Sequence, residues 1–200
     1  MKKGKFIVIE GLDGSGSTTQ INLLAKYLKE KKVKVITTKE PTDNVIGGLI
    51  RGALTNVYTL PESTLQLLFA ADRGHHLQRM VEPALEKGFV VISDRYFWST
   101  VAFGSLTLDR NWLMGLQKYF RMPDFTIILK VSPRECMKRI TENRSHIELY
   151  EKENKLKNVW KTYLWLKRKF SKKIDIVDGE GKIEDVNRRI IKIISDKLDL

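Results

Sequence analysis

The sequence predicts an α/β fold in three layers, with a doubly wound sheet of five parallel strands between two layers of helices. Apolar runs rich in Val and Ile recur at wide intervals, and their nearly continuous apolarity is typical of strands buried on both faces. Segments of helical period separate them, and strands that alternate with helices form parallel sheets covered on both sides. The expected strands are FIVIE (6–10), VKVITT (33–38), FVVISD (89–94), FTIILKV (125–131) and KIDIV (173–177).

The helical segments show apolar residues at three- and four-residue spacing. The first of them, 18–30, places Ile21, Leu24, Ala25 and Leu28 on one face. Further helices are expected at 45–54, 62–86, 148–170 and 182–198. The apolar face of the long segment 62–86 comprises Leu65, Leu68, Phe69, Leu77, Met80, Val81 and Ala84. The 200 residues contain no repeat or linker and fit one domain, 1–200.

Charge, apolar runs and cysteine content exclude several classes of protein. The net charge is +12, but the lysines are spread along every predicted helix, and no segment interleaves arginines with aromatic residues as single-strand binding platforms do. We therefore expect no nucleic-acid partner. No apolar run approaches the roughly 18 residues of a membrane helix, so no membrane association is expected. The lone Cys136 indicates a free core thiol, and no apolar leader follows MKKGK, so a cytoplasmic location is expected.

The stretch EGLDGSGSTTQ (10–20) matches the phosphate-binding pattern G-x-x-x-x-G-K-[ST] except at its lysine. It lies between a predicted strand and a predicted helix. Glycines let backbone amides converge on a phosphate, and the helix N-terminus adds partial positive charge. The Thr18 hydroxyl is placed to bind Mg²⁺. The predicted ATP-binding loop comprises Gly11, Leu12, Asp13, Gly14, Ser15, Gly16, Ser17, Thr18 and Thr19.

Ser17 stands where the pattern has the lysine that pairs with the β- and γ-phosphates. Another register does not restore the charge, because no lysine lies between Lys5 and Lys26. Losing one preorganised electrostatic contact to a transition state costs roughly 3 kcal/mol, on the order of a hundredfold in rate. We therefore expect a slower enzyme, with arginines elsewhere replacing part of the charge. A nucleotide-binding protein without catalysis is the alternative.

Four further motifs follow along the chain. They are KEPT (39–42), VIGGLIRGAL (45–54), LQLLFAADRGHHLQ (65–78) and SDRYFWSTVAFGS (93–105). A P-loop followed by E-P, F-x-x-x-R and D-R-Y-x-x-S-x-x-[YF] is a narrow combination, and over almost the entire chain the sequence resembles the thymidylate kinase family. The resemblance implies the P-loop nucleoside monophosphate kinase fold with a short helical lid. It also implies a transferase that moves the γ-phosphoryl group of Mg²⁺·ATP to dTMP, giving dTDP and ADP in dTTP biosynthesis.

The resemblance implies an acceptor site. Phe69 would stack on thymine, and Arg73, one turn later, would hydrogen-bond its carbonyl. Arg51 and Arg95 would hold the acceptor phosphate, for which a planar guanidinium is suited. The other implied substrate contacts are Asp13 near the 3′-hydroxyl, Glu40 and Pro41 in the pocket wall, Ser99, Thr100 facing the base, and Phe103 crowding the 2′ position of the sugar.

A metal site and a lid complete the expected active site. Asp94, at the end of the strand beside the P-loop strand, is the candidate carboxylate for Mg²⁺, together with Thr18. The resemblance implies a lid at about 132–150, with Arg139 against the adenine and Arg144 reaching the transferred phosphoryl group. With Arg95, these arginines would replace the charge missing at position 17. The candidate catalytic residues are Asp13, Asp94, Arg95 and Arg144.

Substrate preference and assembly stay open at this point. Another pyrimidine nucleotide such as dUMP fits nearly as well as dTMP, because an apolar pocket gains only about 1–3 kcal/mol from a methyl group. The family resemblance implies a homodimer that pairs through helices flanking the sheet. The apolar residues of 45–54 and 62–86 fit either this interface or the core. We expect His75 and His76 at the surface or in the pocket wall.

Overall fold

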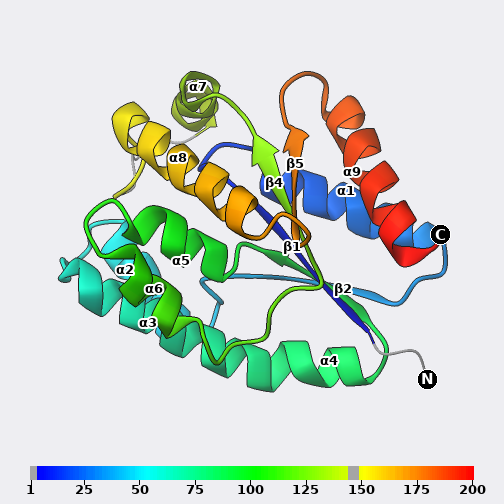
Figure 1. Cartoon of the computed structure of the whole chain (residues 1–200), viewed down its shortest axis with the longest axis horizontal. Coiled ribbons are helices and arrows are strands. Elements are labelled where there is room, and N and C mark those ends of the chain that lie inside the picture. The colour runs from blue at the N-terminus through cyan, green and yellow to red at the C-terminus, as the bar shows by residue number, and fades with distance from the viewer. Residues whose placement is uncertain (1–3, 144–148) are drawn as a thin grey trace.

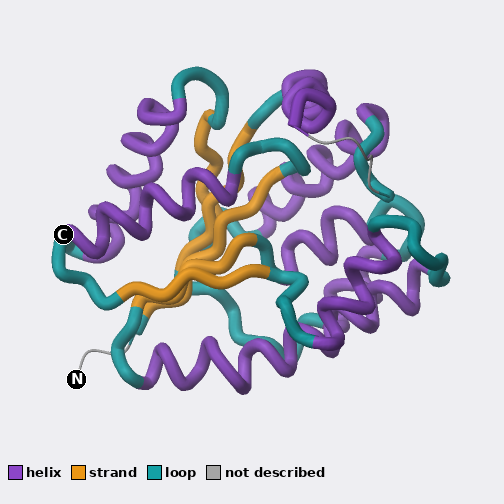
Figure 2. The backbone as a smooth tube through the Cα atoms, turned by 180° about the vertical axis from the view of Figure 1, so that it is seen from behind, coloured by secondary structure: helices purple, strands orange, loops and turns teal. Residues whose placement is uncertain are grey.

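A computed structural model describes the chain except for residues 1–3 and 144–148. Its strands form one parallel sheet in the order β2-β3-β1-β4-β5, with helices on both faces (Figure 1 and Figure 2). The bounds are β1 (Lys5–Gly11), β2 (Val35–Lys39), β3 (Val90–Asp94), β4 (Phe125–Lys130) and β5 (Ile174–Asp178). The predicted three-layer fold is confirmed, and each strand lies at or close to its predicted range.

The predicted helices occur in the predicted order, but the one expected at 148–170 begins at Glu153, the helices Phe97–Gly104 and Arg110–Leu116 were not among the predicted ranges, and the long segment 62–86 is irregular. Their bounds are α1 (Ser17–Glu30), α2 (Val45–Leu54), α3 (Glu62–His76), the π-helix η1 (Leu77–Val81), α4 (Glu82–Glu86), α5 (Phe97–Gly104), α6 (Arg110–Leu116), α7 (Pro133–Asn143), α8 (Glu153–Lys169) and α9 (Ile183–Leu198). The expected burial of Met80 is wrong, since the residue is 37% exposed. A π-turn winds more residues per turn than an α-helix, so η1 shifts the face that the following residues present.

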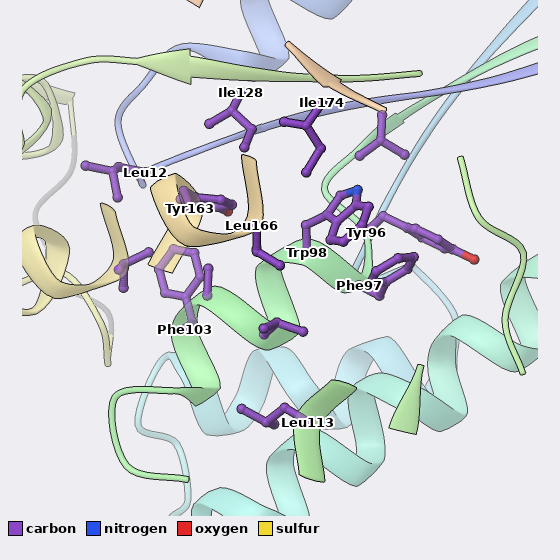
Figure 3. Packing of buried hydrophobic residues seen from close by; sticks show 14 of the residues in the cluster. Leu12, Tyr96, Phe97, Trp98, Phe103, Leu113, Ile128, Tyr163, Leu166 and Ile174 are labelled. Atoms are coloured by element: carbon purple, nitrogen blue, oxygen red, sulfur yellow. The ribbon is translucent and has the colours of Figure 1, made fainter. Parts of the chain in front are cut away.

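The sheet separates two apolar cores. Residues of α1 and α9 pack on one face, where Leu24 and Ile190 are fully buried. On the other face α5 and α8 contact each other, and Trp98 and Leu166 lie beneath Ile128 and Ile174 of the strands (Figure 3). Strands covered on both sides explain the continuous apolarity of the sequence. The thiol of Cys136 is buried in the second core and free, as predicted.

The topology opens a crevice at the carboxyl ends of the strands. The central strand β1 leads into α1 on one face, whereas its neighbours β3 and β4 lead into α5 and α7, which pack with the other core. Ligands of open α/β sheets bind at such a switch point. Within the described residues, no helix has the length and apolarity needed to span a membrane.

Candidate active site

A cavity of about 840 Å³ lies at the carboxyl ends of the central strands. Its wall brings together almost every predicted site residue that the structure describes: Leu12, Asp13, Gly14, Ser15, Gly16, Ser17, Thr18, Thr19, Glu40, Pro41, Arg51, Phe69, Arg73, Asp94, Arg95, Ser99, Thr100, Phe103 and Arg139. Gly11 is not part of the wall; its carbonyl oxygen accepts hydrogen bonds from Arg95 and Tyr163. Arg144 lies outside the described residues.

The phosphate loop joins β1 to α1 through two glycines in left-handed conformations. Gly14 has φ 80° and Gly16 has φ 88°, a region that favours glycine. A Cβ on Gly14 would lie 2.5 Å from the carbonyl oxygen of Cys136 in α7. Two features therefore require glycine at position 14: the left-handed backbone conformation and the close approach of α7. The N-terminus of α1 lines the cavity with Ser17 as its first residue, and the loop sequence 11–19 itself contains no lysine or arginine.

Thr18 and Asp94, the two residues predicted to bind Mg²⁺, contact each other in the cavity wall. Asp94 ends β3 opposite Ile9 of β1, and its Oδ2 accepts a hydrogen bond of 2.5 Å from the Thr18 hydroxyl. Its second carboxylate oxygen, Oδ1, is buried and has no hydrogen-bond partner among the described residues. Buried polar atoms are normally satisfied, so this oxygen is available for a ligand. The pair fits Mg²⁺, which prefers oxygen ligands and is held by one or two carboxylates.

Arg95 lies between the phosphate loop and the acceptor end of the cavity. Its backbone has φ 68°, uncommon for a residue other than glycine, and its N–H donates to the Ile9 carbonyl. Its side chain donates to the Gly11 carbonyl at 3.0 Å, to Ser99 Oγ at 3.1 Å and to Asp13 Oδ1 at 2.6 Å. Strained backbone at a cavity is typical of functional positions. These contacts fix the direction of a cation at the centre of the site.

Arg73 is the cation at the acceptor end and is only 1% exposed. Its Nε and Nη2 pair with Glu40 Oε2 at 2.9 and 2.8 Å, Nη2 also donates to Thr100 Oγ1 at 3.1 Å, and Nη1 donates to Gln117 Oε1 at 2.6 Å. A guanidinium has five N–H groups, and these described contacts use four. The remaining N–H of Nη1 is the donor that this buried group can offer to a carbonyl.

The acceptor end combines this donor with apolar surface. Phe69 of α3 is half-buried in the cavity wall, and Phe103 of α5 is nearly buried. The Phe103 ring lies 5.3 Å from the Tyr150 ring and 5.2 Å from the guanidinium carbon of Arg95. Such contacts hold the Phe103 ring in place. Aromatic rings and guanidinium groups thus lie together in this part of the cavity wall.

Arg51 and Arg139 also line the cavity. Arg51 of α2 donates to the Thr42 carbonyl and lies 3.5 Å from the Asp43 carboxylate. Arg139 of α7 pairs with Glu135 at 2.9 Å, and its Nη1 donates to the Ser15 carbonyl at 3.4 Å. The structure therefore places the Arg139 guanidinium at the phosphate loop. Gly179, Gly181 and Ile183 line the same cavity beyond the loop.

Sequence reasoning misplaced one residue and missed others. His76 is buried, not at the surface or in the cavity wall: its Nδ1 lies 3.0 Å from Glu40 Oε1, and its Nε2 lies 2.7 Å from Thr38 Oγ1. It therefore supports the carboxylate that holds Arg73. His75 is exposed and bonds Asn44. Gln117 belongs to no motif, and its role becomes visible only where the fold brings it to Arg73.

Glu10 was also missed as a site residue, although one feature of the sequence marks it. It is the only charged residue of the predicted strand FIVIE and directly precedes the phosphate loop. In the structure it is completely buried. Burial raises the pKa of its carboxyl group to about 7, although Arg95 and hydrogen bonds from Ser99, Tyr163 and Tyr96 act in the opposite direction.

Comparisons with known proteins agree with this geometry. The family model described as thymidylate kinase matches residues 9–190. A probable thymidylate kinase from Thermococcus gammatolerans is 38% identical over 98% of each chain, and a thymidylate kinase from Caldicellulosiruptor saccharolyticus is 37% identical over 98% of each chain. The solved thymidylate kinase from Candida albicans superposes with a TM-score of 0.83 at 29% identity, covering 98% of this chain and 92% of that one. This chain belongs to the thymidylate kinase family.

Proposed function

We propose that the chain transfers the γ-phosphoryl group of ATP to dTMP, giving dTDP and ADP. The observation that carries this proposal is the single cavity that joins the phosphate loop to the slot of Phe69 and Arg73, with Arg95 between them. Phosphoryl transfer needs two phosphates held in line and their charge neutralised, and little else from the protein. A cavity with cations along its length meets this requirement.

Base selection follows from Arg73. Arg73 lines the cavity, and the N–H that its described contacts leave unused would be the donor to the base. Thymine and uracil present a carbonyl oxygen at C4, whereas cytosine presents an amino group there. A cytosine would place donor against donor in a buried site, so dCMP should be a poor acceptor. The methyl group that separates dTMP from dUMP contributes only about 1–3 kcal/mol, so preference between these two is modest.

Arg95, Arg51 and Asp13 are proposed to hold the sugar and phosphate of the acceptor. Arg95 lines the cavity beside the phosphate loop, where its guanidinium donates to Gly11 and Asp13, and the acceptor phosphate would face that loop. Asp13 already pairs with Arg95, so it can both orient this guanidinium and accept from a 3′-hydroxyl. Phe103, whose ring packs against that of Tyr150, would crowd the 2′ position of the sugar and so favour deoxynucleotides.

Mg²⁺ is proposed as the cofactor, held by Thr18 and Asp94. When bound with ATP it would neutralise charge on the donor phosphates. The Thr18 hydroxyl and the unsatisfied Asp94 oxygen lie at the start of α1, beside the loop that would hold these phosphates. Asp94 also orients the Thr18 hydroxyl.

The charge missing at Ser17 is proposed to come in part from Arg139. Its guanidinium donates to the loop carbonyl of Ser15, beside the backbone that would bind the phosphates, and the adenine contact that the resemblance implies stays a prediction. A residual contribution from Arg144 stays a prediction, since that residue lies outside the described part of the chain. In the pattern the cation is a lysine on the loop itself, whereas here it would come from Arg139 on α7. Its effect on the rate therefore depends on the position of α7.

A homodimer is proposed through α2 and α3. Val45, Leu49 and Leu67 on these helices are 82%, 47% and 50% exposed, and contiguous apolar surface often marks an interface. Sedimentation equilibrium on the chain and on Leu49→Asp tests this: the substitution should convert a dimer to a monomer. A wild-type chain that sediments as a monomer at micromolar concentration contradicts it. The cytoplasmic location stays a prediction from the sequence.

The function is tested by ADP formation from Mg²⁺·ATP with a panel of dTMP, dUMP, UMP and dCMP. We expect dTMP to give the highest kcat/KM, dUMP to follow, and dCMP to be at least about tenfold lower. Arg73→Lys should raise KM for dTMP and reduce discrimination against dCMP, whereas Arg79→Ala, on an exposed position of the same long helix, should change neither. Nucleotide binding without dTMP-dependent ADP would support the non-catalytic alternative.

A further inference from the structure

Glu10, the next-to-last residue of β1, accepts four hydrogen bonds although no solvent reaches it. The backbone N–H groups of Tyr96 and Ser99 donate to its Oε1 at 3.0 and 3.2 Å. The hydroxyls of Ser99 and Tyr163 donate to its Oε2 at 2.6 and 2.8 Å. The donors come from Tyr96 in the β3–α5 turn, from Ser99 in the first turn of α5 and from Tyr163 of α8. A carboxylate at this place therefore ties the central strand to the start of α5.

The two backbone contacts replace the missing cap of α5. Tyr96 is the N-cap residue and its side chain makes no capping bond. In a capping box the side chains of the N-cap and N3 residues satisfy each other's backbone N–H groups. Here Glu10 satisfies the N–H of Tyr96 and that of Ser99, the N3 residue, with one oxygen. A negative charge at a helix N-terminus is favourable as well, so Glu10 fixes the first turn of α5.

Arg95 directly precedes the N-cap residue of α5, and the Ser99 hydroxyl connects its guanidinium to Glu10. Ser99 Oγ donates to Glu10 and accepts from Arg95 Nη1. The hydroxyl is thus a relay with a fixed direction: guanidinium to hydroxyl to carboxylate. Glu10 lies behind the cavity and lines none of it. Its influence on a substrate can pass only through these neighbours.

We propose that Glu10 is a positioning residue for the acceptor phosphate: as a carboxylate it holds the first turn of α5 and the Ser99 hydroxyl so that Arg95 points at that phosphate. This inference rests on the proposed function, in which Arg95 binds the acceptor. Glu10 is not a catalytic residue, because it touches no reacting atom.

Protonation of Glu10 would reverse part of this relay. The charged and titratable groups that face it are Arg95 of the β3–α5 turn, Tyr96 beside it and Tyr163 of α8. A protonated Oε2 must donate, and its acceptors are Ser99 Oγ and Tyr163 OH. The Ser99 hydroxyl hydrogen then turns away from Glu10, toward the side of the Ser99 oxygen that accepts the hydrogen bond from Arg95, and weakens that bond. Since the pKa of Glu10 is about 7, both forms occur near neutral pH. The grip of Arg95 on the acceptor phosphate should therefore weaken as pH falls through 7.

Glu10→Gln tests this with little change in shape. Its amide oxygen can accept from both backbone N–H groups, and its amide N–H₂ can donate to the Ser99 and Tyr163 hydroxyls, so it copies the protonated form at every pH. We expect KM for dTMP to rise about tenfold, as for one weakened charge-assisted hydrogen bond, with KM for ATP unchanged. The control is Glu86→Gln, an exposed carboxylate, which should match the wild type.

The pH profile separates positioning from a general structural role. KM for dTMP should rise between pH 8 and 6 in the wild type and change less in Glu10→Gln. The phosphate of dTMP titrates near 6 in both proteins, so the difference between the two profiles reports Glu10. Equal profiles and an unchanged KM for dTMP would overturn the inference, as would an equal rise in both KM values.

A measurement on the wild-type protein covers the case in which the variant does not fold. Carbon-13 NMR of labelled glutamate follows the Glu10 carboxyl during a pH titration. Coupling between two equilibria is reciprocal, so bound dTMP should lower the titration midpoint of Glu10. A midpoint that dTMP leaves unchanged overturns the inference. A wild-type chain inactive toward dTMP refutes the proposed function and this inference together, whereas an active chain with a wild-type-like Glu10→Gln refutes this inference alone.

Discussion

Gly14→Ala is the sharpest test of the contact between the phosphate loop and α7. The new Cβ would lie 2.5 Å from the Cys136 carbonyl oxygen, whereas ordinary contacts begin near 3.4 Å. Because a backbone carbonyl cannot rotate aside, α7 must retreat by about 1 Å. The left-handed conformation adds roughly 1–2 kcal/mol of strain for alanine. We therefore expect the free energy of unfolding to fall by about 2 kcal/mol.

The retreat of α7 would also break the contact between Arg139 and the loop. Its donor–acceptor distance is already 3.4 Å, so a further 1 Å removes it, and displacements of this size can cost up to about a hundredfold in rate. The rate of ADP formation measures the effect on catalysis, and urea unfolding measures the effect on stability. Gly48→Ala is the matched control, because open space surrounds that helical glycine and alanine there should stabilise α2 by about 0.5–1 kcal/mol. A Gly14→Ala variant with wild-type kcat and stability refutes the described loop contact.

Three further predictions concern charge. Ser17→Lys should raise kcat, and Arg139→Ala should lower kcat about tenfold. If kcat is unchanged in Ser17→Lys, Arg139→Ala and Arg144→Ala, the compensation proposed for Ser17 is wrong. Asp94→Asn should raise the Mg²⁺ concentration needed for half-maximal rate at least about tenfold while leaving dTMP binding in place, as calorimetry without Mg²⁺ would show. Glu10 has a pKa raised from 4.5 to about 7, so its protonated form stabilises the fold, fully below pH 4.5, and this stabilisation is lost as pH rises through 7. At pH 8 the free energy of unfolding of Glu10→Gln, measured by urea unfolding, should therefore exceed that of the wild type by up to roughly 3 kcal/mol. At pH 4.5 the two free energies of unfolding should be equal. A difference between the two proteins that does not depend on pH would contradict this.

Local sequence patterns were sufficient to predict most of the fold and most of the residues that line the candidate site. The strands were predictable because each is buried on both faces, and the phosphate loop was predictable because Gly14 and Gly16 must adopt left-handed conformations. The positions of Phe69, Arg73 and Arg95 came from motif order rather than from physical periodicity. All three line one cavity: Arg95 follows β3 at the edge where the carboxyl ends of the strands meet, and α3 brings Phe69 and Arg73 to the same edge.

The partners of these residues depended on tertiary contacts that no local pattern contains. Gln117 reaches Arg73 from a turn more than forty positions along the chain. His76 is adjacent to an exposed histidine, yet it is buried because Thr38 of β2 and Glu40, just after that strand, bond its two ring nitrogens. The burial of Glu10 likewise depends on α8, where Tyr163 covers it.

The central claim is that one cavity holds the phosphates of ATP facing a thymine nucleotide. Transfer of label from γ-³²P-ATP tests it most directly, with the nucleotides separated after incubation with Mg²⁺ and dTMP. The account predicts label in dTDP, in an amount equal to the ADP formed, and little label in dCDP when dCMP replaces dTMP. Label that stays in ATP, or that appears only as inorganic phosphate whether or not dTMP is present, would contradict it.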